Sequence, residues 1–337
     1  MRAAYLTGPE QIDLGEFALP EPGPGRIRIA VESCGICGSN LHGWRHPELG
    51  ITKGDGPEPG AAGHEIAGTL EDGTLVVVEP NLTGACGACA ACESGTAWFC
   101  RNRTTVPSWG FADAMVVPEA AVFAVPAGVA PATATLTEPL ACAVHAFRWS
   151  FTGRTRGLEG LTVAVLGSGV AGLLTQVTAR EMGAATVLAS ARYPHQAVMS
   201  AALGADEVVD SGEAADRFRR AGPDVVVEAV GGTAPTFGEA LRIVAPAGEV
   251  IGLGLFDIAQ SLDVRRSIFR EQRLFFPVTY GLLDGVHDYD VALAILGRRR
   301  DDLDDLITHR FPLDEVAEAF RSAADKTRGG LRTVVGP

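Results

Sequence analysis

The sequence predicts an α/β protein in two parts, a β-rich part and a doubly wound parallel sheet. Its 337 residues are too many for one ordinary core and suit two domains of roughly 100 to 200 residues each. Residues 1–33 alternate apolar and polar side chains, most clearly in a strand expected at residues 26–31. From Leu161 onward, buried strands alternate with helical segments, the pattern of a parallel sheet. The strands expected there are residues 161–166, 185–190, 207–209, 224–230 and 248–253, and a last strand is expected at 331–335.

Composition and charge describe a globular protein and exclude nucleic acid as a partner. Hydrophobic residues make up 47% of the chain and charged residues 20%. A net charge of −13 and a pI near 5.0 are the opposite of the basic footprint that binds nucleic acid. The start lacks the apolar core of a signal peptide, and no stretch approaches the ~20 apolar residues of a membrane span. We therefore expect a cytoplasmic protein that binds neither nucleic acid nor membranes.

The stretch from Cys34 to His42 is the first candidate for chemistry. It offers a thiolate at Cys37, a hydroxyl at Ser39 and an imidazole at His42, the order required by a metal ligand followed by a proton path. Alone, its Cys-x-x-Cys pattern equally fits a redox pair, half a zinc site or two buried thiols. Ser39 also fits a helix cap, and His42 fits a surface residue.

A second candidate follows at Gly63-His64-Glu65. A lone sequence of this kind is more often a surface turn. Because Cys37 precedes it, we interpret His64 and Glu65 as further ligands of one metal ion, which both could approach at a turn after Gly63. The Gly- and Pro-rich segment 50–60 between the two candidates is a candidate for one wall of a cleft.

Four cysteines lie close together on a loop rich in Gly and Ala, namely Cys86, Cys89, Cys92 and Cys100. Four thiolates at this spacing can close a tetrahedral zinc site that has no open position for a substrate. The alternatives are an iron–sulfur cluster and two disulfides, but the bacterial cluster motif has a different spacing and is followed by Pro. The odd total of seven cysteines also suits metal ligation better than a secreted disulfide framework. We expect a structural zinc ion without a part in the chemistry.

A glycine-rich turn opens the second part of the chain. The strand at 161–166 runs directly into Gly167-Ser168-Gly169-Val170-Ala171-Gly172, and a helical segment follows. This is the context that a dinucleotide-binding motif requires: the first glycine permits a tight turn, the second lets the backbone approach a pyrophosphate, and the third lets the helix pack on the strand. The helix N-terminus then faces the phosphates. The predicted coenzyme contacts are Gly167, Ser168, Gly169, Val170 and Gly172.

The end of the next strand predicts which coenzyme binds. In an NAD site, an acidic residue roughly 20 residues after the turn holds the ribose 2′-hydroxyl. This chain has Ser190-Ala191-Arg192 there and no carboxylate. An arginine in place of a carboxylate favours a 2′-phosphate, so we predict NADP over NAD, with Ser190 and Arg192 as contacts. The alternative is that Arg192 is a solvated side chain.

Together these motifs resemble the zinc-dependent medium-chain dehydrogenases, especially the polyol, sorbitol and threonine dehydrogenase branch. The likeness covers nearly the whole chain and rests on residues 35–39, 63–65, the four-cysteine loop, 138–141, 167–172, 224–232 and 309–312. It implies a GroES-like catalytic domain made of residues 1–145 and 278–337, with the structural zinc loop at 84–101. A Rossmann NAD(P)-binding domain at 146–277 is inserted between them, and the active site lies in the cleft.

The resemblance also implies individual roles. The positions that match ligands of a catalytic zinc are Cys37 and His64, with Glu65 and Glu138 as exchangeable ligands. Cys34 matches a position that is not a ligand. The implied protein holds one catalytic and one structural zinc ion per chain and is a homodimer or homotetramer.

The expected reaction is reversible hydride transfer between a secondary alcohol, of polyol, cyclitol or amino alcohol type, and NAD(P). Zinc would acidify the alcohol, whose proton would leave through Ser39 and His42, the residues that match a proton relay. Two other functions stay open on this scaffold: a zinc-independent alkene or imine reductase, and a non-catalytic dinucleotide-binding protein.

Four departures from the family pattern have expected consequences. Asn40 replaces an aspartate that accepts a hydrogen bond from the ligand histidine; its amide oxygen can still accept that bond but carries no charge, so zinc should be held less tightly. The run at residues 68–78 is short, which trims a hairpin. Trp109 stands where a smaller residue is frequent, and Phe276-Pro277 replaces a frequent Gly-Ser. We expect these last two to alter the cleft and the contacts to the nicotinamide.

Overall fold

The computed structural model describes residues 1–46, 59–104, 109–153 and 157–337. Almost all of the predicted cleft wall at 50–60 lies outside these residues. The described chain forms two compact units. We call residues 1–138 with 289–337 the terminal unit, and residues 139–288 the central unit. The domain boundaries expected after residues 145 and 277 stay a prediction. Within the described residues, no helix combines the length and apolar character needed to cross a membrane.

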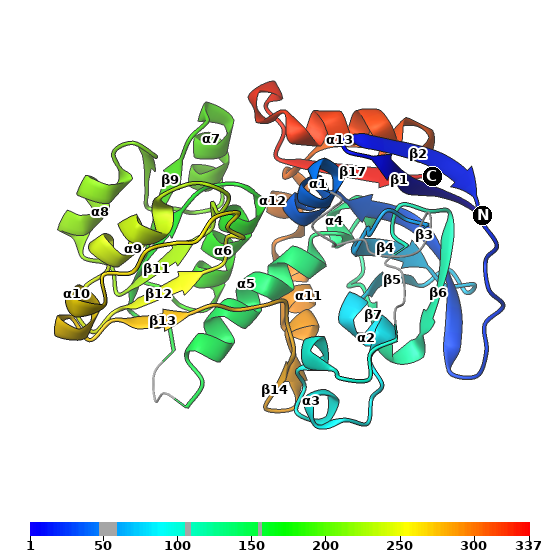
Figure 1. The fold of residues 1–337 in the computed structure, drawn as a ribbon, viewed down its shortest axis with the longest axis horizontal. Helices are drawn as coiled ribbons and strands as arrows, with labels where there is room; N and C mark the ends of the chain where they lie inside the picture. The colour runs from blue at the N-terminus through cyan, green and yellow to red at the C-terminus, as the bar shows by residue number, and fades with distance from the viewer. Residues whose placement is uncertain (47–58, 105–108, 154–156) are drawn as a thin grey trace. The chain divides into compact units, whose positions relative to one another are not determined.

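A six-stranded parallel sheet is the centre of the central unit (Figure 1). Its strands are β8 (Thr162–Leu166), β9 (Thr186–Ala191), β10 (Glu207–Asp210), β11 (Val225–Glu228), β12 (Glu249–Gly252) and β13 (Arg273–Phe275). Their order, β10-β9-β8-β11-β12-β13, is that of a doubly wound sheet with its switch point between β8 and β11. The predicted fold class is therefore confirmed for this unit.

Helices cover both faces of this sheet. They are α5 (Thr137–Ser150), α6 (Val170–Glu181), α7 (Pro194–Ala202), α8 (Ala214–Ala221), α9 (Thr236–Ile243) and α10 (Val264–Phe269). Successive strand residues fall into two separate apolar clusters, since neighbouring side chains point to opposite faces: Val163 belongs to one cluster and Ala164 to the other. A small hairpin of β14 (Leu282–Leu283) and β15 (Val286–His287) follows the sheet.

Both ends of the chain build one sheet in the terminal unit. It contains β16 (Ile307–Pro312), β17 (Arg332–Gly336), β3 (Arg26–Gly35), β4 (Glu65–Thr69), β5 (Leu75–Val78) and β7 (Val122–Ala124) in that order, and β6 (Ala114–Pro118) also pairs with β3. β17 runs antiparallel to β3 and pairs Val335 with Cys34. The strands β1 (Arg2–Gly8) and β2 (Gln11–Glu16) form a separate hairpin.

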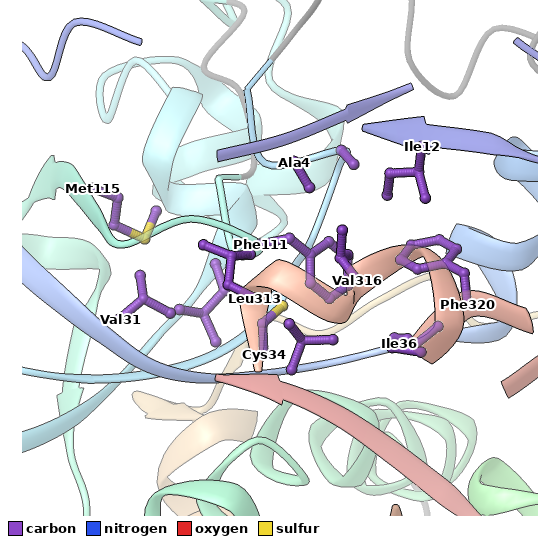
Figure 2. Close-up of a cluster of buried hydrophobic side chains, with 14 of the residues drawn as sticks. Ala4, Ile12, Val31, Cys34, Ile36, Phe111, Met115, Leu313, Val316 and Phe320 are labelled. Carbon is purple, nitrogen blue, oxygen red and sulfur yellow. The ribbon is translucent and has the colours of Figure 1, made fainter. Parts of the chain in front are cut away.

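The helices of the terminal unit are mostly short. They are α1 (Gly38–Arg45), α2 (Pro80–Gly84), α3 (Ala90–Glu93), α4 (Pro131–Ala134), α11 (Asp288–Arg298), α12 (Arg300–Asp304) and α13 (Val316–Ala324). α13 packs against β2 and encloses an apolar core with β3 (Figures 1 and 2). The core positions the loop that joins β3 to α1, where the first candidate residues lie.

Candidate metal and coenzyme sites

Three predicted ligands come together in the terminal unit. Cys37 immediately precedes α1, and His64 and Glu65 lie at the start of β4. One ligand atom from each of the three lies within 4.8 Å of the others. A zinc ion bonded to sulfur and nitrogen at about 2.0–2.3 Å would span such a group, so this donor set fits zinc.

The imidazole of His64 is oriented by the backbone. Its Nδ1 lies 2.9 Å from the carbonyl oxygen of Ala62, which can only accept, so Nδ1 carries the proton and Nε2 faces the group. Asn40 does not bond His64, although its amide oxygen is able to accept the hydrogen bond that an aspartate at this position would accept. Its Oδ1 accepts from the Cys37 N–H at 3.0 Å, and its Nδ2 donates to the Ala62 carbonyl at 3.0 Å. An amide has a donor that a carboxylate lacks, which explains why this side chain bonds the carbonyl instead of the ring.

Cys37 and His64 stabilise each other in their charged forms. Burial opposes the thiolate, but the hydrogen bond and charge of His64 outweigh it and lower the pKa of Cys37 to about 6. Burial opposes the imidazolium too, but the bond and charge of Cys37 raise the pKa of His64 to about 9. The Cys37 thiolate and the His64 ring thus share one proton through their hydrogen bond. A divalent cation bound to both residues would take the place of that proton.

Glu65 lies between Arg332 and the candidate metal group. Its carboxylate forms an ion pair with Arg332 of β17, and the two residues are 0% and 2% exposed. The pair uses Oε2, whereas Oε1 has no hydrogen-bond partner within the described residues, which is consistent with an oxygen that can ligate a metal. A side chain at Gly35 would collide with both residues, so the glycine makes room for the pair. Sequence reasoning missed Arg332, although a lone charge inside the apolar strand 331–335 was a usable signal.

Glu138 lies close by but outside this group of three. It is 8% exposed in the first turn of α5. Burial lowers the pKa of His64, Cys37 raises it most, and the negative charge of Glu138 raises it further. Among the described residues, the group within 4.8 Å contains Glu65 and not Glu138.

The two predicted relay residues are on α1. The Ser39 hydroxyl lies 3.4 Å from Nε2 of His64. His42 is three residues further along, hence on the same helix face, and its ring centroid is 5.5 Å from that of His46. Ser39 is not the helix cap, because the cap position belongs to Cys37.

The four cysteines of the loop at 84–101 also come together. Their sulfur atoms all lie within 4.8 Å of one another, with Cys89 at 3.6 Å from Cys92 and 3.8 Å from Cys100. A tetrahedron of Zn–S bonds of about 2.3 Å has edges of about 3.8 Å, so the cluster fits zinc. Backbone and thiol hydrogen bonds, chiefly from Cys92, lower the pKa of Cys89 to about 6. All seven cysteines lie within the described residues, and none of them is in a disulfide there.

The glycine turn in the central unit has the geometry that the motif predicts. Gly167 has φ of 95°, which favours glycine, and a side chain at Gly172 would collide with the Gly167 carbonyl. Nothing lies within 4 Å of a Cβ placed at Gly169, so the backbone there is open to a ligand. Val170 then begins α6, whose N-terminal N–H groups can bind phosphate.

The two residues predicted to read the ribose differ in exposure. Ser190 is 3% exposed, and its Oγ accepts from the Gly167 N–H at 3.0 Å, so its side chain holds the turn. Arg192 is exposed, with its guanidinium carbon 5.7 Å from the ring centroid of Tyr193.

Of the two bulky departures from the family pattern, Trp109 lies beside the candidate metal group and Phe276 lies beside β12. Trp109 forms a bridge with Gly63, next to His64. Phe276 is 60% exposed beyond β13, and its ring would block any side chain at Gly252.

Comparison with known proteins defines the class first. An alcohol dehydrogenase GroES-like domain profile matches residues 23–127, and a zinc-binding dehydrogenase profile matches residues 169–296. These two domains in one chain are those of the two-domain alcohol dehydrogenases that use zinc and NAD(P).

Individual relatives then place the chain in its family. An L-threonine 3-dehydrogenase of Pyrococcus furiosus is 31% identical, over 95% of this chain and 94% of its own length. An L-idonate 5-dehydrogenase of Vitis vinifera is 27% identical, over 97% of this chain and 92% of its own. A crystal structure from Sinorhizobium meliloti 1021, described as a candidate zinc-binding dehydrogenase bound to NADP, is 28% identical with a TM-score of 0.83, over 100% of this chain and 99% of that one. The chain belongs to the zinc-dependent medium-chain dehydrogenases and is an NAD(P)-dependent enzyme of the alcohol dehydrogenase type.

Proposed function

We propose that this enzyme oxidises the secondary hydroxyl of a polyol, cyclitol or amino alcohol to a ketone, reversibly, with NADP as the preferred hydride acceptor. The observation that carries the proposal is the group of Cys37, His64 and Glu65, with the Ser39 hydroxyl beside it. The named relatives support the substrate class, because L-threonine is an amino alcohol and L-idonate is a polyhydroxy acid. Arg192 supports NADP.

The residues around the group have separable roles. Cys37 and His64 would hold a zinc ion, with Glu65 or Glu138 as an exchangeable ligand, and this ion would act as a Lewis acid that lowers the pKa of a substrate hydroxyl. Ser39 would accept the hydroxyl proton and pass its own proton on towards His42, a role supported by its hydroxyl lying 3.4 Å from Nε2 of His64.

Further parts of the proposal rest on the sequence and on the resemblance. The four-cysteine cluster would hold a second, structural zinc ion. The chain would consist of the catalytic and coenzyme domains delimited above, assemble as a homodimer or homotetramer and work in the cytoplasm. The zinc-independent alkene or imine reductase is the competing function, and no feature of the described residues favours it.

A substrate panel tests the proposal. Zinc-loaded enzyme and NADP are mixed with polyols, cyclitols, amino alcohols and simple secondary alcohols, and NADPH absorbance is followed. We expect turnover with a member of the first three classes, and a loss of about 10²-fold or more in kcat for Ser39→Ala but a smaller loss for Ser39→Thr, which keeps the hydroxyl. Reduction of an activated alkene or imine by NADPH, without any alcohol oxidation, would contradict the proposal.

A further inference from the structure

Four polar side chains are buried together beneath the glycine turn of the central unit. They are Ser168, Gln176, Ser190 and Ser200, which are 1%, 1%, 3% and 0% exposed. They come from four places: the turn itself, α6, the end of β9, and α7. Burying polar groups costs free energy unless they are hydrogen-bonded, so their partners indicate what the group does.

Ser168 is the centre of this group. Its Oγ donates to the Ser190 carbonyl at 2.9 Å and accepts from the Gln176 Nε2 at 3.2 Å and the Ser200 Oγ at 2.8 Å. A serine hydroxyl has one proton to donate and two lone pairs, so these three bonds use its whole capacity. Its side chain is turned inward, and a coenzyme could meet Ser168 only through its backbone.

A second hydrogen bond joins the glycine turn to Ser190. The Gly167 N–H donates to the Ser190 Oγ at 3.0 Å, so Ser190 is joined to the turn through both its side chain and its carbonyl. Arg192 lies just beyond Ser190, and α7, which carries Ser200, begins at Pro194. The four residues therefore connect the turn that would hold the pyrophosphate with the segment that would hold the adenosine ribose.

We propose that Ser200 and Gln176 are positioning residues for the coenzyme, which act through Ser168 to fix the glycine turn relative to the end of β9. This inference rests on the proposed coenzyme site, since one dinucleotide must reach both the open backbone at Gly169 and the side chain of Arg192. Neither positioning residue is exposed enough to touch the ligand. Oε1 of Gln176 has no hydrogen-bond partner within the described residues, and burying this oxygen lowers the stability of the folded protein. The Nε2 donor, which bonds Ser168, is therefore the atom of the amide that serves the turn.

Two variants and one control test this role in the full-length enzyme. Ser200→Ala deletes one donor to Ser168. Gln176→Met deletes the other donor together with the unpartnered oxygen, so it should fold at least as well as the wild type. Thr178→Val is the matched control, because the Thr178 hydroxyl is equally buried in α6 and its one bond among the described residues goes to the Leu174 carbonyl of its own helix, at 2.8 Å.

The readouts are the dissociation constants of NADPH and NADH by fluorescence, the kinetic constants and the melting temperature. Each test variant should weaken coenzyme binding by about three- to tenfold and raise KM for the coenzyme more than it lowers kcat, as expected for one lost hydrogen bond. The double variant should lose less than the product of the two single effects, because both act through one hydroxyl. Thr178→Val should change coenzyme binding by less than about twofold, whatever it does to the melting temperature.

Unchanged coenzyme binding in both Ser200→Ala and Gln176→Met, or an equal loss in Thr178→Val, would overturn the positioning role. This outcome differs from failure of the proposed NADP preference. If the wild type binds NADH more tightly than NADPH, that preference is wrong, while the same variants still test the positioning role with NADH.

Discussion

Cys34 and Cys37 show how strongly a local environment separates two thiols of one motif. The Cys34 side chain points into the apolar core beside Val31, Phe111 and Leu313 (Figure 2), and burial raises its pKa. The Cys37 thiol instead faces His64, which lowers its pKa. The Cys-x-x-Cys pattern alone left a redox pair open. The structure separates the two thiols because β3 ends at Gly35: Cys34 lies within the strand, whereas Cys37 lies beyond it, at the start of α1.

At the same scale, Arg192 should determine the choice of coenzyme. We expect Arg192→Ala to lower kcat/KM for NADP by about 10- to 100-fold, because charge-assisted bonds to a 2′-phosphate are lost, and to change kcat/KM for NAD by less than about twofold. Steady-state kinetics with both coenzymes measure this. Arg219→Ala, which removes another exposed arginine from α8, should leave the ratio unchanged. An NADP preference that survives in Arg192→Ala would show that its source lies elsewhere.

Glu79 should make stability depend on pH. It caps α2 by accepting from the N–H groups of Asn81 and Leu82, at 3.0 and 2.7 Å, and burial raises its pKa to about 8. Because the folded pKa exceeds the unfolded one, the native state retains a proton that the unfolded state loses. The stability contributed by this group is complete below about pH 4.5 and falls by about 1.4 kcal/mol per pH unit towards pH 8.

The Glu79→Gln variant keeps an acceptor oxygen without the titration. Urea denaturation of both proteins between pH 5 and pH 8 should therefore give profiles that diverge, with the variant gaining relative to the wild type as pH rises. Parallel profiles would show that Glu79 is already ionised in the folded protein at pH 5.

At the scale of elements, the long apolar strands could be predicted from the sequence, whereas irregular and short ones could not. Residues 161–166 gave β8 almost unchanged, because an apolar run before a glycine turn has few alternatives. β3 extends to residue 35 and not to 31, since a register shift between Val31 and Ser33 lets the strand continue through polar residues. The edge strand β13 has only three residues and begins with Arg273, so its apolar pattern is too short to distinguish a strand from a loop.

The four-cysteine loop is an element whose fold should depend on its metal. Cys92→Ser should lose the structural zinc ion and lower the melting temperature by about 5 °C or more, while the folded enzyme at low temperature keeps its kcat. Metal analysis and calorimetry measure the two effects. Ser94→Ala in the same loop should retain the ion, because within the part of the chain that the structure describes its hydroxyl bonds Ala91 and Thr96 and no cysteine. Loss of zinc without loss of stability would show that the loop folds by itself.

At the scale of the whole molecule, the sequence predicted the fold class and the family, but it did not predict how the partners of the site residues are arranged. The motifs at residues 37, 64 and 167–172 are short, and each could be predicted because a local turn presents its residues. The partners that set their chemistry come from distant segments, as Arg332 does for Glu65 and Cys37 does for His64. Such pairings depend on how both ends of the chain join one sheet, which no local pattern specifies.

The zinc content of purified wild-type and variant proteins, measured with alcohol-dependent reduction of NADP on the same samples, tests the central claim most directly. We predict about two zinc ions per chain in the wild type and about one in Cys37→Ser and in His64→Ala, both without turnover. Cys34→Ala should keep both ions and its activity despite lower stability. Full zinc content and full activity in Cys37→Ser would contradict the claim that this thiol and the imidazole of His64 hold the catalytic metal.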